Sequence, residues 1–211
     1  MLFLPLLLLF LFLISLASTW GIAESIAIKP RYFLSLWEQG KKEMDLQQWQ
    51  GAEDSLRFAS RLNSSNSEYI LDLGRLYELR ASKKPVWTTH AHQYRAQAIH
   101  YFRDASQRRP VWAMAWVLLG LSKTLNQELD GETILALDKA IQFGPWEYGV
   151  QRRIIWLGFS IWDHLPEKTR QNLQYVIKQS YQRHNLRRFI KGTAKHFKRE
   201  EMLQVIIEDI K

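Results

Sequence analysis

The stretch Tyr69-Ile-Leu-Asp-Leu-Gly-Arg-Leu-Tyr77 decides the fold that this sequence predicts. Gly74 lies inside an otherwise strong helical pattern, where a glycine costs about 1 kcal/mol relative to alanine. Close approach of a second helix at the glycine would compensate for that cost. Gly40 precedes Gly74 by one period of 34 residues, and Leu119-Gly120 repeats the pattern further along the chain. We therefore predict repeated pairs of helices that pack closely at these glycines.

A second pattern comes after each glycine and keeps the same internal spacing of four, three and five residues. It consists of a small residue, then Leu or Phe, then Ala, then a residue at which the helix is expected to end. The three sets are Ala52, Leu56, Ala59 and Ser64; Ala98, Phe102, Ala105 and Pro110; and Thr133, Leu137, Ala140 and Pro145. Helical hairpins with a period of 34 residues are typical of tetratricopeptide repeats. An ordinary helical bundle with accidental repetition is the alternative.

The chain is expected to be all-α, because no stretch shows the alternation typical of a strand. The expected fold is a tetratricopeptide-like α-solenoid of three to four helical hairpins, with an N-terminal transmembrane helix and a basic C-terminal capping helix. The expected helices are 31–46 with 48–62, 67–81 with 92–108, 111–125 with 131–143, 147–163 with 166–183, and a terminal basic helix over 185–209. The expected segments are an anchor (1–20), a linker (21–32), repeats over 33–147 (33–66, 67–112 and 113–147), and a fourth hairpin with the basic cap (148–211).

Residues 1–23 carry no charged side chain, and residues 2–16 are almost entirely Leu, Phe and Ile. The apolar run approaches the ~20 residues that a spanning helix needs, and Trp20 suits a membrane interface. A cleaved signal peptide is the alternative, since Ser15-Leu16-Ala17 resembles a cleavage site. The usual basic segment before the apolar run is missing, which favours an uncleaved anchor.

The two rules that predict the orientation of this anchor disagree. Lys29 and Arg31 come after the apolar run, and the positive-inside rule would therefore leave the helical domain in the cytoplasm. A single signal-like helix at the N-terminus more commonly exports the rest of the chain. We predict a single-pass inner-membrane protein with its domain in the periplasm.

No catalytic motif stands out among the 211 residues, and no cysteine is present to form a disulfide. The sequence lacks a glycine-rich phosphate loop, a nucleophile elbow and a His-Glu-x-x-His zinc motif. Neither an enzymatic activity nor a cofactor is therefore expected.

The insertion over residues 82–91 is the most unusual loop of the sequence. His90 and His92 could reach a metal ion if the segment were extended, and His100 could add a ligand, but no acidic or Cys partner lies nearby. Solvated histidines, with Trp87 holding the loop on the helices, are the expected arrangement. Five further tryptophans are expected to pack between hairpins, although an exposed one could stack on a sugar: Trp112, Trp116, Trp146, Trp156 and Trp162.

The C-terminal part of the chain is strongly basic. Residues 168–199 hold ten Lys or Arg and no Asp or Glu, and an apolar helical stripe runs through Leu186, Phe189, Ile190 and Phe197. The expected basic surface consists of Arg187, Arg188, Lys191, Lys195, Lys198 and Arg199. It could bind lipid headgroups or an anionic polysaccharide, or it could only solvate the end of the repeats. Nucleic acid is not expected, because no recognition motif accompanies the charge.

Three features together resemble the VpsP family, whose small members are encoded with bacterial exopolysaccharide biosynthesis systems. These features are the N-terminal apolar segment, the stretch from Tyr69 to Tyr77, and Gly144-Pro-Trp-Glu147 followed by Val150-Gln151. The resemblance implies a non-enzymatic scaffold of polysaccharide synthesis or export. Its partners would be other proteins of that machinery.

In tetratricopeptide proteins the first helix of each unit lines a concave groove. The corresponding positions hold Leu34, Trp37, Lys41 and Met44 in the first unit, Glu68, Leu71, Arg75 and Glu78 in the second, and Met114, Val117, Leu121 and Thr124 in the third. The resemblance implies a partner-binding groove made of Trp37, Lys41, Met44, Glu68, Arg75 and Glu78. The leading hypothesis is a membrane-anchored scaffold that holds a peptide segment of another protein. The alternative is direct binding of anionic polysaccharide or lipid through Trp87 and the basic tail.

Overall fold

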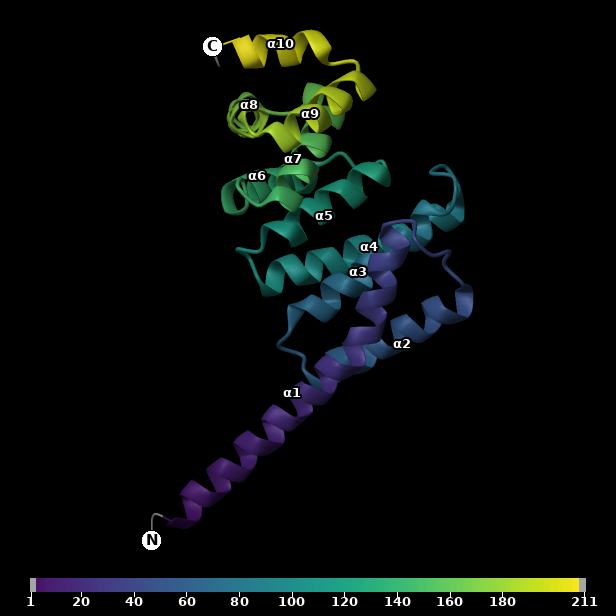
Figure 1. The fold of residues 1–211 in the computed structure, drawn as a ribbon, viewed down its shortest axis with the longest axis vertical. Coiled ribbons are helices and arrows are strands. Elements are labelled where there is room, and N and C mark those ends of the chain that lie inside the picture. Colours follow the sequence, from purple (N-terminus) through teal and green to yellow (C-terminus); the bar gives the residue numbers. More distant parts are fainter. Residues whose placement is uncertain (1–2, 209–211) are drawn as a thin grey trace. The chain divides into compact units, whose positions relative to one another are not determined.

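The computed structural model describes residues 3–208, and every regular element within that range is a helix (Figure 1). The α-helices are α1 (Phe3–Glu38), α2 (Leu46–Leu62), α3 (Ser67–Ser82), α4 (Thr89–Arg108), α5 (Ala113–Leu125), α6 (Gly131–Phe143), α7 (Tyr148–Ser160), α8 (Glu167–Gln182), α9 (His184–His196) and α10 (Glu200–Glu208), and a 3-10 turn, η1, covers Trp162–His164. The prediction of an all-α chain is confirmed. The first two residues of the expected anchor and the last three of the expected cap lie outside the described residues.

The chain forms two compact units, Met1–Tyr101 and Phe102–Lys211. In the first unit α1 packs on α2 and α3, and α2 also packs on α3. In the second unit α5 packs on α6 and α7, α7 on α8 and α9, and α10 on α8 and α9. Each unit therefore contains consecutive helices that pack on their neighbours in sequence.

The repeated pattern of small and large apolar residues identifies buried positions in the structure. Its first three residues are at most 3% exposed in every set: Ala52, Leu56 and Ala59; Ala98, Phe102 and Ala105; Thr133, Leu137 and Ala140. Small residues at these positions let neighbouring helices approach, and the larger residue between them fills the remaining space.

The predicted glycine contacts are confirmed at Gly120 and wrong at Gly40. A Cβ atom built on Gly120 would lie 2.7 Å from Leu157 Cδ2 of α7, so a larger residue would force Leu157 to move at this helix crossing. Gly40 lies beyond the end of α1, has φ +67° and has no other atom within 4 Å of its Cβ position. The left-handed backbone, rather than a helix contact, explains the glycine there.

Helix α1 continues through residues 21–32, which corrects the predicted linker, and it ends at Glu38, which corrects the predicted helix over 31–46. Its buried residues, Ala23, Ala27, Pro30, Leu34 and Trp37, recur every three or four positions and form one apolar face. Burial of this face compensates for the hydrogen bond that Pro30 removes inside the helix.

The predicted helix over 185–209 is also wrong, because the chain turns between α9 and α10. Lys198 has φ +54° in this turn. The turn lets both helices bury their own apolar residues, Leu186 and Ile190 in α9 and Leu203 and Ile206 in α10. A straight helix would not direct both faces to one core.

Within the described residues, α1 is the helix long and apolar enough to cross a membrane, by length and composition. Its first twenty residues, 3–22, are almost all exposed, in contrast to the buried face that begins at Ala23. One helix thus has an uncovered apolar half and a half that packs in the first unit.

Candidate functional site

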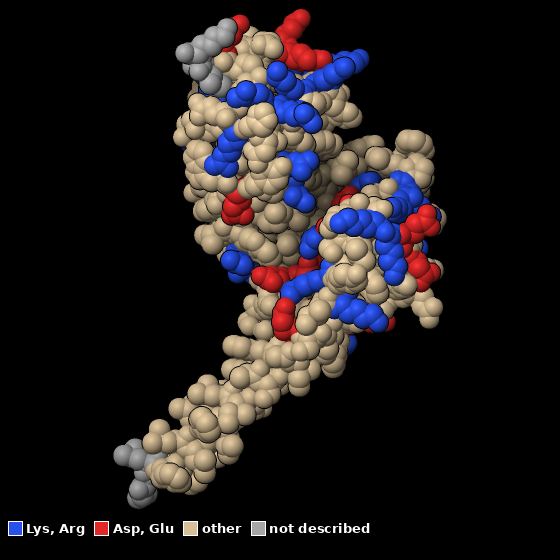
Figure 2. All heavy atoms as spheres, viewed as in Figure 1, with Lys and Arg blue, Asp and Glu red and all other residues tan. Residues whose placement is uncertain are grey.

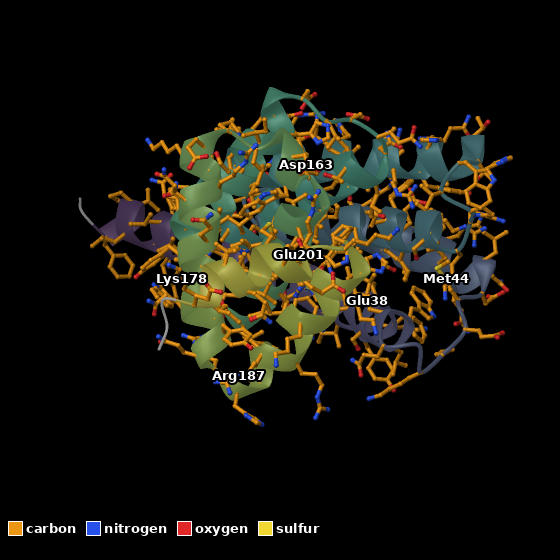
Figure 3. All side chains as sticks on the ribbon, turned by 90° about the horizontal axis from the view of Figure 1, so that it is seen from above. Glu38, Met44, Asp163, Lys178, Arg187 and Glu201 are labelled. Atoms are coloured by element: carbon orange, nitrogen blue, oxygen red, sulfur yellow. The ribbon has the colours of Figure 1, made fainter. Side chains whose placement is uncertain are left out.

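The predicted groove of the first unit is only partly on helices. Lys41 and Met44 lie in the segment between α1 and α2, because α1 ends at Glu38. Figure 3 labels Glu38, the last residue of α1, and Met44, which follows it before α2. Neither Lys41 nor Met44 has the place on a first helix that the resemblance implies.

Arg75 of α3 is held by two carboxylates of its own chain. Its Nε and Nη2 donate to Glu38 Oε1 and Oε2 at 3.0 and 2.7 Å, and its Nη1 donates to Asp72 Oδ1 at 2.8 Å. Burial lowers the pKa of Arg75, but the hydrogen bonds and charges of Glu38 and Asp72 outweigh it and raise that pKa overall. The side chain joins α3 to the end of α1.

Arg31 of α1 makes the matching contacts from the other helix. Its Nε donates to Asp72 Oδ2 at 2.7 Å, and its other nitrogens pair with Glu68 and Glu24. Asp72 is only 4% exposed, so both of its oxygens are satisfied in a buried position. Glu68 and Arg75, both predicted to bind a partner, therefore help to fix α1 to α3.

Trp37 and Glu78 also serve the fold. Trp37 is 2% exposed and stacks on Phe33 with ring centroids 5.5 Å apart. Glu78 Oε1 accepts a hydrogen bond from Nε of the buried Arg95 at 3.3 Å. Four of the six predicted groove residues thus have their functional groups in internal contacts.

A hollow of about 360 Å³ opens on α7 in the second unit, and we call it the α7 hollow. It is lined by Leu121 of α5, by Tyr148, Gly149, Arg152, Arg153 and Trp156 of α7, and by Phe189 of α9. Within the described residues, none of these lining side chains is a carboxylate or a carboxamide. The hollow therefore combines aromatic surface with positive charge.

Aromatic rings surround the exposed Arg152. Its guanidinium carbon lies 4.5 Å from the Phe189 ring centroid and 5.9 Å from that of Tyr148. Trp156 meets Phe197 edge to face, with centroids 5.2 Å apart. Cation–π contacts hold a guanidinium in place without neutralising it, so its charge remains available to a ligand.

Close helix crossings fix the position of α7. Leu157 fills the space left at Gly120 of α5, and Leu173 of α8 packs so closely on Gly158 that its Cδ1 lies 2.8 Å from the glycine's Cβ position. The buried Gln151 accepts a hydrogen bond from Arg183 at 3.1 Å. Most residues of the α7 hollow thus stand on a helix that packs against α5 and α8, which favours a preformed site.

Sequence patterns single out Leu121 and Trp156, but not the two arginines or the role of Phe189. The available signal was the spacing of Tyr148, Arg152 and Trp156, which places them on one helix face. The repeat pattern ends near residue 147, so it assigns no groove positions to this helix.

The predicted basic surface is exposed except at Arg199, which pairs with Asp163. Arg187 also donates through Nε to Tyr181 O at 3.1 Å, and Figure 3 shows it at the edge of α9. His184, Asn185, Arg187, Arg188 and Lys191 line a shallow depression of about 510 Å³. On the visible face of the second unit, Lys and Arg outnumber Asp and Glu (Figure 2).

The loop and tryptophan expectations are partly wrong. Trp87 is 79% exposed and does not hold the loop on the helices, and Trp146 is 50% exposed. Trp112, Trp116, Trp156 and Trp162 are partly buried, as expected for packing. In the part of the chain that is described, no three His, Cys, Asp or Glu side chains gather closely enough to hold a metal ion.

Lys123 forms a second internal charge cluster, between α5 and α6. It is 2% exposed and pairs with Glu128, Asp130 and Glu132, while Arg103 donates two bonds of 2.6 and 2.7 Å to Glu132. The hydrogen bond from Arg103, aided by Lys123 and opposed by desolvation, lowers the pKa of Glu132 to about 2. These contacts hold the connection between the two helices.

No model of a known protein family matches the chain. A search of curated proteins also finds no match. The residues of the site are therefore the basis for a functional proposal.

Proposed function

We propose that this protein is a membrane-anchored helical scaffold whose α7 hollow holds an acidic peptide segment of a partner protein, without catalysis of its own. The observation that carries the proposal is the exposed Arg152 between aromatic rings on a rigid helix. Such a surface offers one apolar contact area and one charge, which suits a large apolar side chain next to a carboxylate.

The chemistry of the lining favours a peptide over a sugar. Carboxylates and carboxamides are the side chains with the most acceptor sites for the hydroxyl donors of a neutral sugar, and the lining provides none within the described residues. The cations and rings that are present match an acidic residue beside Leu, Phe or Trp.

We further propose that the hairpins follow a tetratricopeptide-like solenoid. Three observations support this arrangement. The repeated small and large apolar residues are buried in α2, α4 and α6, α5 and α7 cross closely at Gly120, and α7 packs on both α5 and α9. In such a solenoid α5, α7 and α9 would be equivalent first helices and would line the concave face. The α7 hollow lies on these three helices.

The setting we propose is exopolysaccharide synthesis or export at the bacterial inner membrane, with the helical domain in the periplasm. The resemblance of the sequence motifs to the VpsP family supports the process. The exposed apolar half of α1 supports the membrane attachment.

Site-specific photocrosslinking in the native host would test the proposal. A photoreactive residue at position 152 is expected to capture a partner protein. Arg152→Glu is expected to reduce co-purification of that partner at least tenfold, because the glutamate repels the acidic segment that the arginine attracts. Arg188→Glu is the matched control, because Arg188 is an exposed arginine of α9 outside the hollow lining.

The proposal fails if Arg152→Glu and Arg188→Glu retain the same partners. Binding of the purified chain to an anionic polymer or to anionic vesicles that is lost in Arg188→Glu but kept in Arg152→Glu would instead favour a second candidate, binding of an anionic polymer or lipid on α9. The depression lined by Arg187, Arg188 and Lys191 favours that candidate. Such binding should disappear at high salt.

A further inference from the structure

A polar pocket of about 440 Å³ lies between α1 and α2 in the first unit, and we call it the α1–α2 pocket. Lys29, Pro30 and Phe33 of α1 form one wall, and Gln47, Gln48 and Ser55 of α2 form the other. None of these residues belongs to the α7 hollow or to the basic surface. The pocket therefore raises a separate question about a ligand.

Two ammonium groups lie on one aromatic ring of this pocket. Nζ of Lys42 is 4.5 Å and Nζ of Lys29 is 5.8 Å from the ring centroid of Phe33. Within the described residues neither lysine forms an ion pair. Asp45 also lines the pocket, where its charge offsets that of one of the two lysines, and its carboxylate accepts from Gln48 N at 3.0 Å and caps α2. The pocket thus has a net positive charge and attracts an anion.

The opposite wall can accept hydrogen bonds. Gln48 Oε1 is buried without a hydrogen-bond partner among the described residues. Ser55 Oγ donates its proton to Gly51 O at 2.7 Å, which leaves its lone pairs to accept. A ligand with a negative centre and hydroxyl donors would satisfy both walls.

The pocket comes directly after the exposed apolar part of α1. Residues 3–22 would cover about 30 Å, the thickness of the hydrocarbon layer, and Lys29 lies about 10 Å further along the axis. Side chains of a helix point back toward its N-terminus, so the Lys29 ammonium reaches toward the headgroups.

Apolar side chains next to the lining residues are also exposed. Ile28 is 62% exposed, Tyr32 59% and Leu46 47%. Each is a sequence neighbour of a residue that lines the pocket. Exposed apolar side chains on the same helices as a cationic pocket suit the interface of a bilayer, where acyl chains and headgroups meet.

We propose that the α1–α2 pocket binds the headgroup of an anionic phospholipid with hydroxyl groups. Lys29 and Lys42 hold the phosphodiester, and Gln48 and Ser55 accept from the headgroup hydroxyls. The acyl chains run along the exposed apolar part of α1. The bound lipid sets the depth of the first unit relative to the membrane.

Native mass spectrometry of the full chain in non-ionic micelles tests this proposal. Micelles doped with phosphatidylglycerol should yield one retained lipid, and micelles doped with phosphatidylcholine should yield far less. The Lys29→Gln, Lys42→Gln double variant should bind phosphatidylglycerol about thirtyfold more weakly, because the loss of each lysine charge near an anionic headgroup weakens binding about fivefold.

A second variant blocks the α1–α2 pocket without removing a charged side chain. Gly51 has no other atom within 4 Å of its Cβ position, so Gly51→Leu fits α2 and fills the pocket, and it should also abolish retention. Lys139→Gln is the matched control, because Lys139 lies 5.4 Å from the Phe143 ring in the other unit. Circular dichroism checks that all variants remain helical.

Equal retention of both lipids, or full retention by both pocket variants, overturns the proposal. Displacement of the lipid by millimolar inorganic phosphate also overturns it, because the pocket then binds a free anion without the acyl chains. This test is independent of the partner-binding experiment, because Arg152 lies in the second unit and the α1–α2 pocket in the first.

Discussion

Asp72→Asn is the substitution that tests most directly how α1 is attached to the helical domain. Asp72 is 4% exposed and accepts from Arg31 Nε at 2.7 Å and from Arg75 Nη1 at 2.8 Å. Asparagine keeps the shape of the side chain but removes its charge. Its amide NH₂ would also face one of the two guanidinium donors, so one hydrogen bond is lost and the other is weakened.

The size of the expected loss depends on the contacts that remain. A hydrogen bond to a charged group contributes about 1.5–3 kcal/mol net. Arg31 keeps Glu24 and Glu68, and Arg75 keeps both bonds to Glu38, so neither arginine is left unpaired. We therefore expect Asp72→Asn to lower the free energy of unfolding by about 2–3 kcal/mol, below the ~3–5 kcal/mol of a fully broken buried pair.

Urea unfolding of the full chain in mild detergent, followed by tryptophan fluorescence, measures this loss. The midpoint should fall by about 1–2 M at unchanged slope. Asp54→Asn is the control, because Asp54 is an exposed carboxylate of α2, and it should change the free energy by less than about 0.5 kcal/mol. Equal midpoints for the two variants would refute the reasoning that Asp72 joins α1 to α3.

Two further predictions concern the packing of α7 and the charge cluster between α5 and α6. Gly158→Ala should destabilise the chain by about 1–3 kcal/mol, because its Cβ would clash with both methyl carbons of Leu173. Gly51→Ala, whose Cβ would lie in open space, should instead stabilise α2 by about 0.5–1 kcal/mol. Thermal unfolding measures both variants, and losses of equal size would contradict the packing argument. The pKa of Glu132 is lowered from 4.5 to about 2 in the folded state, so its stabilisation is present above pH 4.5 and is lost as the pH falls toward 2. The full difference corresponds to about 3.4 kcal/mol, which solvent screening of the partly exposed group reduces to about 1–2 kcal/mol. Glu132→Gln should remove this part of the acid sensitivity between pH 4.5 and 2 in urea titrations, and an unchanged pH profile would contradict it.

The candidate site shows where sequence reasoning stopped. Spacing placed Trp37, Glu68, Arg75 and Glu78 on helices, but it could not show that Trp37 would be buried or that Arg31, Glu38, Asp72 and Arg95 would occupy the charged groups of Glu68, Arg75 and Glu78. Arg31 and Glu38 come from α1 and Arg95 from α4, whereas Asp72 lies on α3 itself, three residues before Arg75. The same limit applies to Arg152, whose aromatic neighbour Phe189 is 37 residues away in the sequence.

The sequence by itself determined the all-α class, the apolar N-terminal helix, most helix positions between residues 46 and 182, and the small buried residues of the repeated pattern. These features depend on side-chain periodicity within one helix, which local sequence contains. Only the tertiary structure decided that α1 continues past Pro30, that the basic tail turns at Lys198, and which charged groups remain exposed. Burial of an apolar face and pairing of charges depend on which helix surfaces meet, and that is settled by packing across the whole unit.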